Sequence, residues 1–399
     1  MQSPVYWRLS GFYFFYFAFI GAFQPYFSLY LKSLAFSAAQ IGVLMSMPQL
    51  TRIVSPNFWG WVADHTGRRV AIVQWASAMS LLSFAGLFFG IGFAWILIMS
   101  LLMGLFWSGS LPIAEAITMT ELQDEPNRYG HVRLWGSIGF ITATMIVGIA
   151  LDYIPIHYLL WICVGLLAGV MPLTWSLPDT PAIQHDHTHQ PVWEILKRPE
   201  VITLFVACFL MIVAHGPLYV FYAIYLVDHD YSKTAVGLLI AVSVVSEIMV
   251  FLYQPKLFKR FSLRTVMLAC FAIAVVRFLM IGWGAEFIVL LIIAQLLHAA
   301  TFGAFHAASV AAVHEIFKGR HQARGQTLYT SVAYGAGGTV GGLASVFLWE
   351  RVGPYATYNV AAATAFVGLL LVWWKLRLPD EKNSKIAEPE SSRISPDVG

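Results

Sequence analysis

The sequence predicts an all-α polytopic membrane protein with twelve transmembrane helices in two six-helix bundles. Composition is the first observation that predicts it. Of the 399 residues, 58% are hydrophobic and only 11% are charged, and the mean hydropathy is +0.70. A soluble protein of this size needs more charged surface than this chain provides. The other observations are the length of the apolar runs and the distribution of positive charge.

Twelve apolar runs follow one another along the chain, separated by short polar connections. Each is long enough to cross the ~30 Å hydrocarbon core of a bilayer as a helix. The first run is too long for the core of a signal peptide, so we expect it to be the first span. The runs lie near residues 9–31, 40–63, 70–92, 93–119, 131–152, 156–177, 201–227, 234–257, 264–283, 286–313, 325–349 and 354–376.

Lys and Arg are distributed unevenly between the two sides of this arrangement. If both termini face the cytoplasm, eighteen of the 24 lie on the cytoplasmic side and three lie within spans. Only Lys32, Lys233 and Arg351 lie outside. Because positive residues favour cytoplasmic loops, we expect a multi-pass protein of a bacterial-type inner membrane with both termini in the cytoplasm.

A long polar segment at residues 179–199 divides the chain. We expect an N-terminal bundle over 1–178, a cytoplasmic linker over 179–199, a C-terminal bundle over 200–378 and a cytoplasmic tail over 379–399. The linker contains the run His185-Asp186-His187-Thr188-His189. Alternating histidines can bind a metal, but a solvated linker explains them more simply, and no metal site is expected.

The two halves match when one is shifted by 195 residues. Tyr30 then falls on Tyr225, Gly42 on Gly237, and Arg69 on Arg264. The identities cluster at helix ends and loops, where a duplicated transporter keeps its geometry. We therefore predict two pseudo-symmetric bundles around a site at the midplane.

A short polar loop lies between the second and third runs, and we take it as a conformational loop. Two glycines let the chain reverse, an aspartate can cap a neighbouring helix end, and two arginines hold the loop on the cytoplasmic side. The pattern Gly-x-x-x-Asp-x-x-Gly-Arg-Arg resembles the loop between helices 2 and 3 of the major facilitator superfamily. The conformational loop then consists of Gly60, Asp64, Gly67, Arg68 and Arg69. We expect it to latch the cytoplasmic helix ends through Asp64 and Arg68.

Ionisable residues inside the spans are candidates for function, because a charge in the apolar core costs several kcal/mol unless it is paired or faces water. The shift of 195 residues superimposes Arg52 on Glu247. Arg52 can hold a substrate carboxylate. Glu247 can carry a coupled proton, since a carboxylate in a poorly hydrated cavity binds protons reversibly near neutral pH. The alternative is a structural salt bridge.

Glu115 and Arg133 lie on adjacent antiparallel spans, so they can meet as an ion pair. The pair resembles the acidic–arginine pair through which lactose permease binds its substrate. Substrate contact and simple interhelical pairing both remain open, and Arg133 can alternatively extend to the cytoplasmic interface.

The tenth span carries His298 and His306, eight residues apart and therefore on one helix face, with Phe302 between them. Either histidine can relay protons with Glu247. A metal site is disfavoured, because ligating pairs on helices prefer spacings of three or four. His215, beside Gly216-Pro217 where the seventh span is expected to break, is interpreted as a hydrogen-bonded packing residue.

Several stretches resemble the 3-phenylpropionic acid transporter group of the superfamily. They are Tyr129–Ser137, Ala223-Ile224-Tyr225, Val275-Val276-Arg277 and the tenth span. The resemblance implies a proton-coupled importer of an aromatic carboxylate that works by alternating access. It implies a cationic anchor for the carboxylate at Arg52, Arg133 or Arg277. It implies a proton site at Glu247 with His298 or His306, and Arg277 is also assigned to proton coupling. The aromatic walls of the substrate site include Tyr30, Tyr225 and Phe302.

Three other functions stay open at this point. The chain can be a proton symporter for an oligosaccharide or nucleoside, a proton-driven efflux antiporter, or, least favoured, a non-transporting sensor or metalloenzyme. The net charge of +3 is too small to indicate nucleic acid binding. We expect the protein to be a monomer in the lipid bilayer and not an enzyme. Its expected partners are a small-molecule substrate and protons, and the proton gradient takes the place of a cofactor.

Overall fold

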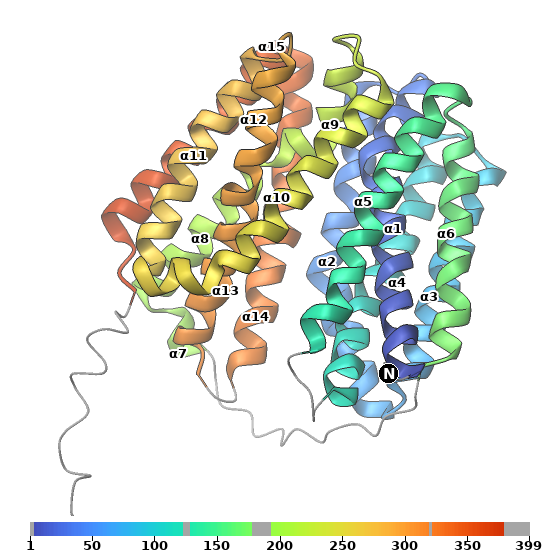
Figure 1. Ribbon diagram of the computed structural model, residues 1–399, viewed down its shortest axis with the longest axis horizontal. Helices are drawn as coiled ribbons and strands as arrows, with labels where there is room; N and C mark the ends of the chain where they lie inside the picture. The colour runs from blue at the N-terminus through green and yellow to red at the C-terminus, as the bar shows by residue number, and fades with distance from the viewer. Residues whose placement is uncertain (1–3, 123–127, 178–192, 319–320, 379–399) are drawn as a thin grey trace, which may run out of the picture.

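The computed structural model describes residues 4–122, 128–177, 193–318 and 321–378, without the side chains of Asp64 and Ala323. Within these residues every regular element is a helix. Figure 1 shows two helical bundles side by side, the first coloured blue to green and the second yellow-green to red. The His185–His189 run and the tail after residue 378 lie outside the described residues.

The first bundle contains six long helices. α1 packs on α5 and α6, α2 packs on α4, and α3 packs on α4 and α6. Their bounds are α1 Pro4–Ser33, α2 Ala38–Thr66, α3 Arg69–Ala85 with a 3₁₀ turn Gly86–Phe89, α4 Phe93–Glu121, α5 Tyr129–Tyr153 and α6 Tyr158–Trp175.

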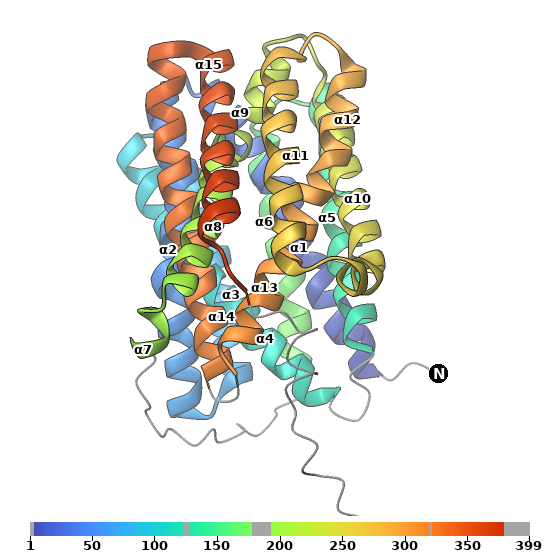
Figure 2. The same ribbon diagram turned by 90° about the vertical axis from the view of Figure 1, so that its left-hand side faces the viewer.

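The second bundle follows the short helix α7 (Trp193–Leu196) and contains more interruptions. Figure 2 shows its last helix, α15, beside α8 and α2, in agreement with the packing of these helices. Its elements are α8 Pro199–Ala214, α9 Gly216–Val227, α10 Lys233–Arg260, α11 Leu263–Trp283, α12 Ile288–His298, the π-helix η3 Ala299–Ala304, α13 Phe305–Ile316, α14 Gln322–Thr330, the π-helix η5 Ser331–Gly337 and α15 Gly338–Lys375.

Ten stretches of described helix are long and apolar enough to cross a membrane. The last of them, Arg324–Lys375, has 52 residues and covers the two predicted spans 325–349 and 354–376. Within it Gly353 breaks the helix at φ +81°. The predicted span 40–63 corresponds to α2, which is not among the ten. The all-α membrane fold is therefore confirmed, and the count of twelve spans stays a prediction.

The predicted break in the seventh span is present at His215, where α8 ends and α9 begins. Pro217 follows directly, and proline cannot donate the backbone hydrogen bond that would continue the helix. Gly216 is also tightly packed, because an added Cβ would lie 2.2 Å from the carbonyl oxygen of Gly341. A larger residue at position 216 would separate α9 from α15.

The loop between α2 and α3 is shorter than the sequence suggested. The prediction that Gly60 helps the chain to reverse is wrong, because Gly60 lies inside α2, which continues to Thr66. Gly67 alone makes the turn, with φ +67° and its N–H bonded to the carbonyl oxygen of Ala63 at 2.9 Å. This left-handed cap is the geometry that glycine favours. Arg68 precedes α3, and Arg69 begins it as a buried residue. The predicted role of the Asp64 side chain lies outside the described residues.

Polar contacts join the two bundles at the distal end, which we define as the end opposite the N-terminus of α1, drawn at the top of Figure 1. The Asp152 carboxylate accepts hydrogen bonds from the backbone N–H groups of Lys233 and Thr234 at 2.8 and 2.9 Å. The Glu350 carboxylate accepts one from the Ala39 N–H at 2.7 Å. Lys32 and Asp228 form an ion pair.

The two carboxylate contacts are related by the internal repeat. The shift of 195 residues places Ala39 on Thr234, so the first turns of α2 and α10 are each capped by an acid from the opposite bundle. Unpaired N–H groups and the helix dipole make such N-termini favourable sites for carboxylates. We call these two contacts the distal caps. They hold the distal end closed in this structure.

Close packing of α1 on α5 should depend on Gly139. An added Cβ there would lie 2.1 Å from the carbonyl oxygen of Phe14, whereas one at Gly165 on α6 meets nothing within 4 Å. We expect Gly139→Ala to lower the free energy of unfolding by about 1–3 kcal/mol, as overpacking does. Gly165→Ala should leave it unchanged or raise it, since alanine is the better helix former. Thermal unfolding in detergent checks both, and equal stability of the two variants would contradict the packing.

Removal of both distal caps should favour opening of the distal end. Each cap contributes about 1 kcal/mol, so Asp152→Ala with Glu350→Ala should raise the open fraction by roughly tenfold or more. Spin labels at Tyr153 and Val289, both exposed, report the separation of the bundles. Glu286→Ala, an exposed acid at the same end, serves as the control. An unchanged distance distribution in the double variant would show that the caps do not hold this end.

Candidate functional site

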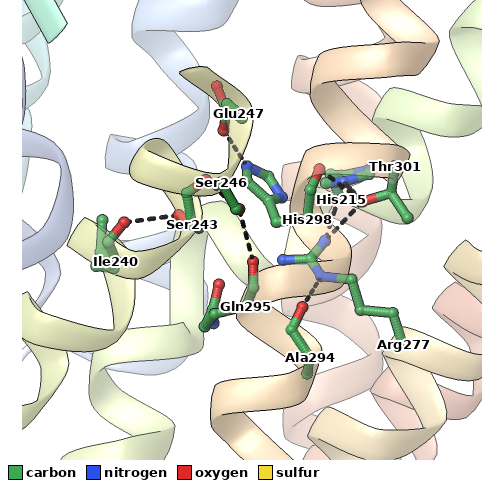
Figure 3. Close-up of polar contacts among 10 residues, drawn as sticks. All are labelled: His215, Ile240, Ser243, Ser246, Glu247, Arg277, Ala294, Gln295, His298 and Thr301. Atoms are coloured by element: carbon green, nitrogen blue, oxygen red, sulfur yellow. Dashed lines mark hydrogen bonds and ion pairs between the residues drawn. The ribbon is translucent and has the colours of Figure 1, made fainter. Parts of the chain in front are cut away.

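Arg277 is the centre of the polar groups in the second bundle (Figure 3). It lies on α11 and none of its surface is exposed. Its Nε donates to the carbonyl oxygen of Ala294 at 2.8 Å. Its Nη1 donates to Thr301 Oγ1 at 3.1 Å and to His215 Nε2 at 3.2 Å. The guanidinium therefore ties α11 to α12, to the π-helix η3 and to the break between α8 and α9.

The tautomer of His215 follows from its two partners. Nδ1 lies 2.8 Å from the carbonyl oxygen of Met211, and a carbonyl oxygen can only accept, so Nδ1 carries the hydrogen. Nε2 is then the acceptor for the Arg277 guanidinium, and the ring is neutral. The break at Gly216 places this ring against α11. His215 is thus a hydrogen-bonded packing residue, as interpreted from the sequence, and it also orients Arg277.

Glu247 and His298 form the second feature of the site. Glu247 Oε1 lies 2.9 Å from His298 Nε2, which joins α10 to the last residue of α12. The two side chains keep 14% and 10% of their surface exposed. Figure 3 shows the imidazole between the carboxylate and the Arg277 guanidinium. A carboxylate and an imidazole in contact can share one proton, and this pair can therefore take up and release a proton.

The π-helix η3 brings the rings of the tenth predicted span into a stack. His298 and Phe302 have ring centroids 5.2 Å apart, and Phe302 and His306 6.3 Å, each pair with planes at 14°. The predicted common face is therefore present. His306 Nδ1 lies 2.9 Å from the hydroxyls of Tyr329 and Tyr334. Phe302 lies between the two imidazoles, and the one in contact with Glu247 is His298.

Arg52 and Glu247 do not form an ion pair with each other. Arg52 lies half-buried on α2, and both charges lie within electrostatic range of Tyr219 and Tyr334. The structure therefore places the superimposed residues around the same tyrosines, from opposite bundles. The salt bridge considered as their alternative role is not formed among the described residues.

Glu115 and Arg133 are brought together in the first bundle. Arg133 Nε lies 4.0 Å from Glu115 Oε1, and the guanidinium lies 4.0 Å above the centre of the Phe17 ring. More than a third of the Glu115 side chain remains exposed. The pair is thus a loose one, stacked on an aromatic surface and accessible to a polar ligand.

Tyr30 and Tyr225 lie near the distal ends of α1 and α9 and are buried. The Tyr225 hydroxyl donates to the carbonyl oxygen of Gly282 at 2.7 Å. Its ring packs against Trp349 and Tyr358. Tyr30 stacks on Phe27. Neither tyrosine is among the residues that contact Arg277, Glu247 or His298. The structure therefore does not place these two predicted substrate-binding residues next to that polar cluster.

The family of the chain follows from a comparison of sequences. The model of the MFS_1 like family matches residues 6–360. The chain belongs to this family. A protein of Escherichia coli called "Probable 3-phenylpropionic acid transporter" is 29% identical over 92% of this MFS transporter and 96% of its own length. The maltose permease of Geobacillus stearothermophilus is 25% identical over 90% and 92%.

A solved structure agrees with the fold. The nucleoside transporter NupG has a TM-score of 0.84 and 18% identity, covering 94% of this chain and all of that one. Because the chain belongs to the MFS_1 like family and its relatives are transporters, it is a multi-pass secondary transporter and not an enzyme. The substrates that appear in the names of its relatives differ from one relative to the next.

Some residues of the site were not predicted from the sequence. Thr301 and Tyr222 are two such residues, since Thr301 accepts from Arg277 and the Tyr222 hydroxyl accepts from the Gln295 amide. Thr301 and Gln295 were visible as polar residues in an apolar run. The turn of π-helix that aims Thr301 at Arg277 has no such signal, because its extra residue per turn is set by tertiary packing.

Tyr225 should act through stability rather than through substrate contact in this MFS transporter. Tyr225→Phe loses the hydrogen bond to Gly282 and should lower the free energy of unfolding by about 0.5–1.5 kcal/mol. Tyr358 is the matched control, because its buried hydroxyl has no hydrogen-bond partner. Tyr358→Phe should keep or raise stability. Thermal unfolding and substrate KM test this, and a rise in KM without loss of stability in Tyr225→Phe would assign Tyr225 to the substrate instead.

Proposed function

We propose that this transporter is a proton-coupled importer of a small aromatic carboxylate that works by alternating access. The observation that carries the proposal is the Glu247–His298 contact at 2.9 Å, beside the buried guanidinium of Arg277. An acid and a base in contact, partly exposed and next to a fixed cation, provide a site that binds a proton reversibly. The cargo is proposed from the similarity to the E. coli relative.

The distal caps supply the conformational part of the cycle. In the proposed orientation the distal end faces outward, and both termini lie in the cytoplasm. Opening this end requires the caps of α2 and α10 to separate, after which proton and carboxylate enter from outside. Closure restores the caps, and the opposite ends separate for release inward, with the loop at Gly67, Arg68 and Arg69 controlling those ends.

The cationic anchor for the carboxylate is proposed among Arg52, Arg133 and Arg277. Each faces a different neighbourhood: Arg52 the tyrosines between the bundles, Arg133 the Phe17 ring, and Arg277 the Glu247–His298 pair. Phe302 supplies an aromatic surface beside His298. The proton gradient is the only energy source proposed, without a cofactor, and the transporter is proposed to act as a monomer in an inner membrane.

A second candidate is a proton symporter for an oligosaccharide or a nucleoside. The Glu115–Arg133 pair favours it, because a carboxylate and a guanidinium above an aromatic ring can bind hydroxyl groups and stack a sugar or base. The maltose permease relative supports this candidate. A proton-driven efflux antiporter would use the same proton site with the opposite direction of substrate movement.

Uptake into liposomes tests the proposal. Under an inward proton gradient, labelled 3-phenylpropionate should accumulate, and a protonophore should abolish the accumulation. Glu247→Gln should reduce the accumulation at least about tenfold, because an amide cannot exchange a proton at this site. The exposed Glu286→Gln is the matched control and should transport normally. Liposomes without protein measure the passive entry of the acid.

The other outcomes separate the candidates. Accumulation of labelled maltose or uridine instead of 3-phenylpropionate would retain the proton-coupled mechanism and replace the cargo. Loss of 3-phenylpropionate from loaded liposomes under an inward proton gradient would indicate an antiporter. Normal accumulation by Glu247→Gln would contradict the assignment of the proton site.

A further inference from the structure

Arg277 has two N–H groups that nothing in the structure uses. Of its five donors, one on Nε and two on Nη1 are taken by Ala294, Thr301 and His215. Nη2 is buried and has no hydrogen-bond partner among the residues that the structure describes. An unsatisfied charged donor in the interior is costly, since the desolvation penalty is not offset. The Nη2 donors of Arg277 can therefore bind one further hydrogen-bond acceptor.

Arg277 also has no counter-ion in direct contact among the described residues. Its three partners are a carbonyl oxygen, a hydroxyl and a neutral imidazole, and no carboxylate within the described residues lies within ion-pair distance of it. Glu247 is the nearest candidate, but it pairs with His298. A buried cation without a counter-ion is destabilised by several kcal/mol. The missing acceptor is therefore best supplied by an anion.

His298 carries the second unused group. Its Nδ1 is buried and has no partner within the described part of the chain, while its Nε2 faces Glu247. Figure 3 shows the Arg277 guanidinium beside the His298 ring, on the side away from Glu247. Both residues also adjoin His215, whose ring centroid lies 5.9 Å from that of His298. Two buried groups with free hydrogen-bonding capacity thus lie together.

The chemical character of His298 Nδ1 depends on a single proton. When the pair is deprotonated, Nε2–H donates to the Glu247 carboxylate and Nδ1 presents a lone pair. When the pair holds one more proton, either Glu247 donates to Nε2 of a neutral ring or the carboxylate faces an imidazolium. In both of these forms Nδ1 carries a hydrogen. One proton therefore converts Nδ1 from an acceptor into a donor.

We propose that Arg277 Nη2 and His298 Nδ1 together bind the carboxylate of the cargo, and that the proton on the Glu247–His298 pair is what makes this site competent. The inference rests on the proposed import of a carboxylate and identifies Arg277 as its anchor, in place of Arg52 or Arg133. One carboxylate oxygen accepts from Nη2 and the other from Nδ1–H. Without the proton, the Nδ1 lone pair and the Glu247 charge repel the anion.

This arrangement explains why proton and anion move together. The protonated site has one net positive charge, and the bound carboxylate neutralises it. The deprotonated site is already neutral and offers no second donor. The titratable and charged groups that interact with the pair from the surrounding helices are His215 at the α8–α9 break, Tyr219 on α9, Arg277 on α11 and Tyr334 in η5. Two further groups lie behind them: Arg52 on α2 interacts with Tyr219 and Tyr334, and Tyr222 on α9 interacts with Arg277.

Binding to the purified full-length protein tests the site. The probes are 3-phenylpropionate, acetate and the uncharged 3-phenylpropanol, and dissociation constants are measured by calorimetry between pH 5 and pH 9. We expect both carboxylates to bind and their affinity to fall about tenfold per pH unit once the linked proton is lost. The alcohol should bind weakly and without this pH dependence.

Three variants make the test specific. Arg277→Lys keeps the charge but has no Nη2 donor, and should weaken carboxylate binding at least about tenfold. Glu247→Gln should retain binding with a pH-independent affinity, because an amide can donate to Nε2 or accept from it without any change of charge. A purely structural role of Glu247 would not produce this change of pH profile. Arg260→Gln, exposed at the end of α10, is the control.

The outcomes distinguish this inference from the proposed function. If acetate binds with the expected pH dependence and Arg277 requirement but 3-phenylpropionate does not, the anion site stands and the cargo is wrong. If 3-phenylpropionate is accumulated but folded Arg277→Lys binds it as tightly as the unaltered protein, the anion site is overturned and the proposed function stands. The Glu247→Gln variant is tested with Arg277 in place, so its result does not depend on the folding of Arg277→Lys. If its carboxylate affinity keeps the pH dependence of the unaltered protein, the inference is also overturned.

Discussion

The buried guanidinium of Arg277 is the constraint around which the second bundle is arranged. A fully buried arginine needs acceptors from its surroundings, and the helices supply them by departing from regular geometry. The break at His215 offers a ring nitrogen, and the π-helix η3 turns Thr301 toward the same Nη1. These irregularities cost backbone hydrogen bonds, and irregular helix inside a membrane is tolerated only where it is buried or faces a cavity. Their position around one cation indicates that they serve it.

The distal caps connect this centre to the motion of the two bundles. Both caps use a helix N-terminus as the partner of a carboxylate, and the internal repeat relates them. Such contacts are strong enough to hold one end closed and weak enough to be exchanged within a transport cycle, since each contributes about 1 kcal/mol. α10 takes part in both features. The N–H groups of its first turn donate to Asp152, and its interior carries Glu247. One helix therefore connects the distal caps to the Glu247–His298 pair, which is the proposed proton site.

Much of this organisation could be predicted from the sequence. Apolar runs located the helices because a bilayer demands long uncharged segments, and the cost of charge in such segments pointed to Glu247, Arg277, His298 and the Glu115–Arg133 pair. The role of Gly60 was wrong, since a glycine in a polar stretch looks like a turn whether or not the helix continues through it. The sequence left open whether Glu247 meets Arg52, His298 or His306, because the internal shift and the helix face align positions without fixing which side chains meet. The π-helices and the unused donors of Arg277 and His298 depend on tertiary packing alone.

The central claim is that one proton creates the anion site, and counting protons tests it most directly. In weakly buffered solution above the pH at which the Glu247–His298 pair is protonated, addition of acetate or 3-phenylpropionate should draw protons onto the protein, approaching one per anion bound. In Glu247→Gln the same titration should take up none. Binding without proton uptake by the unaltered protein across this pH range would contradict the account.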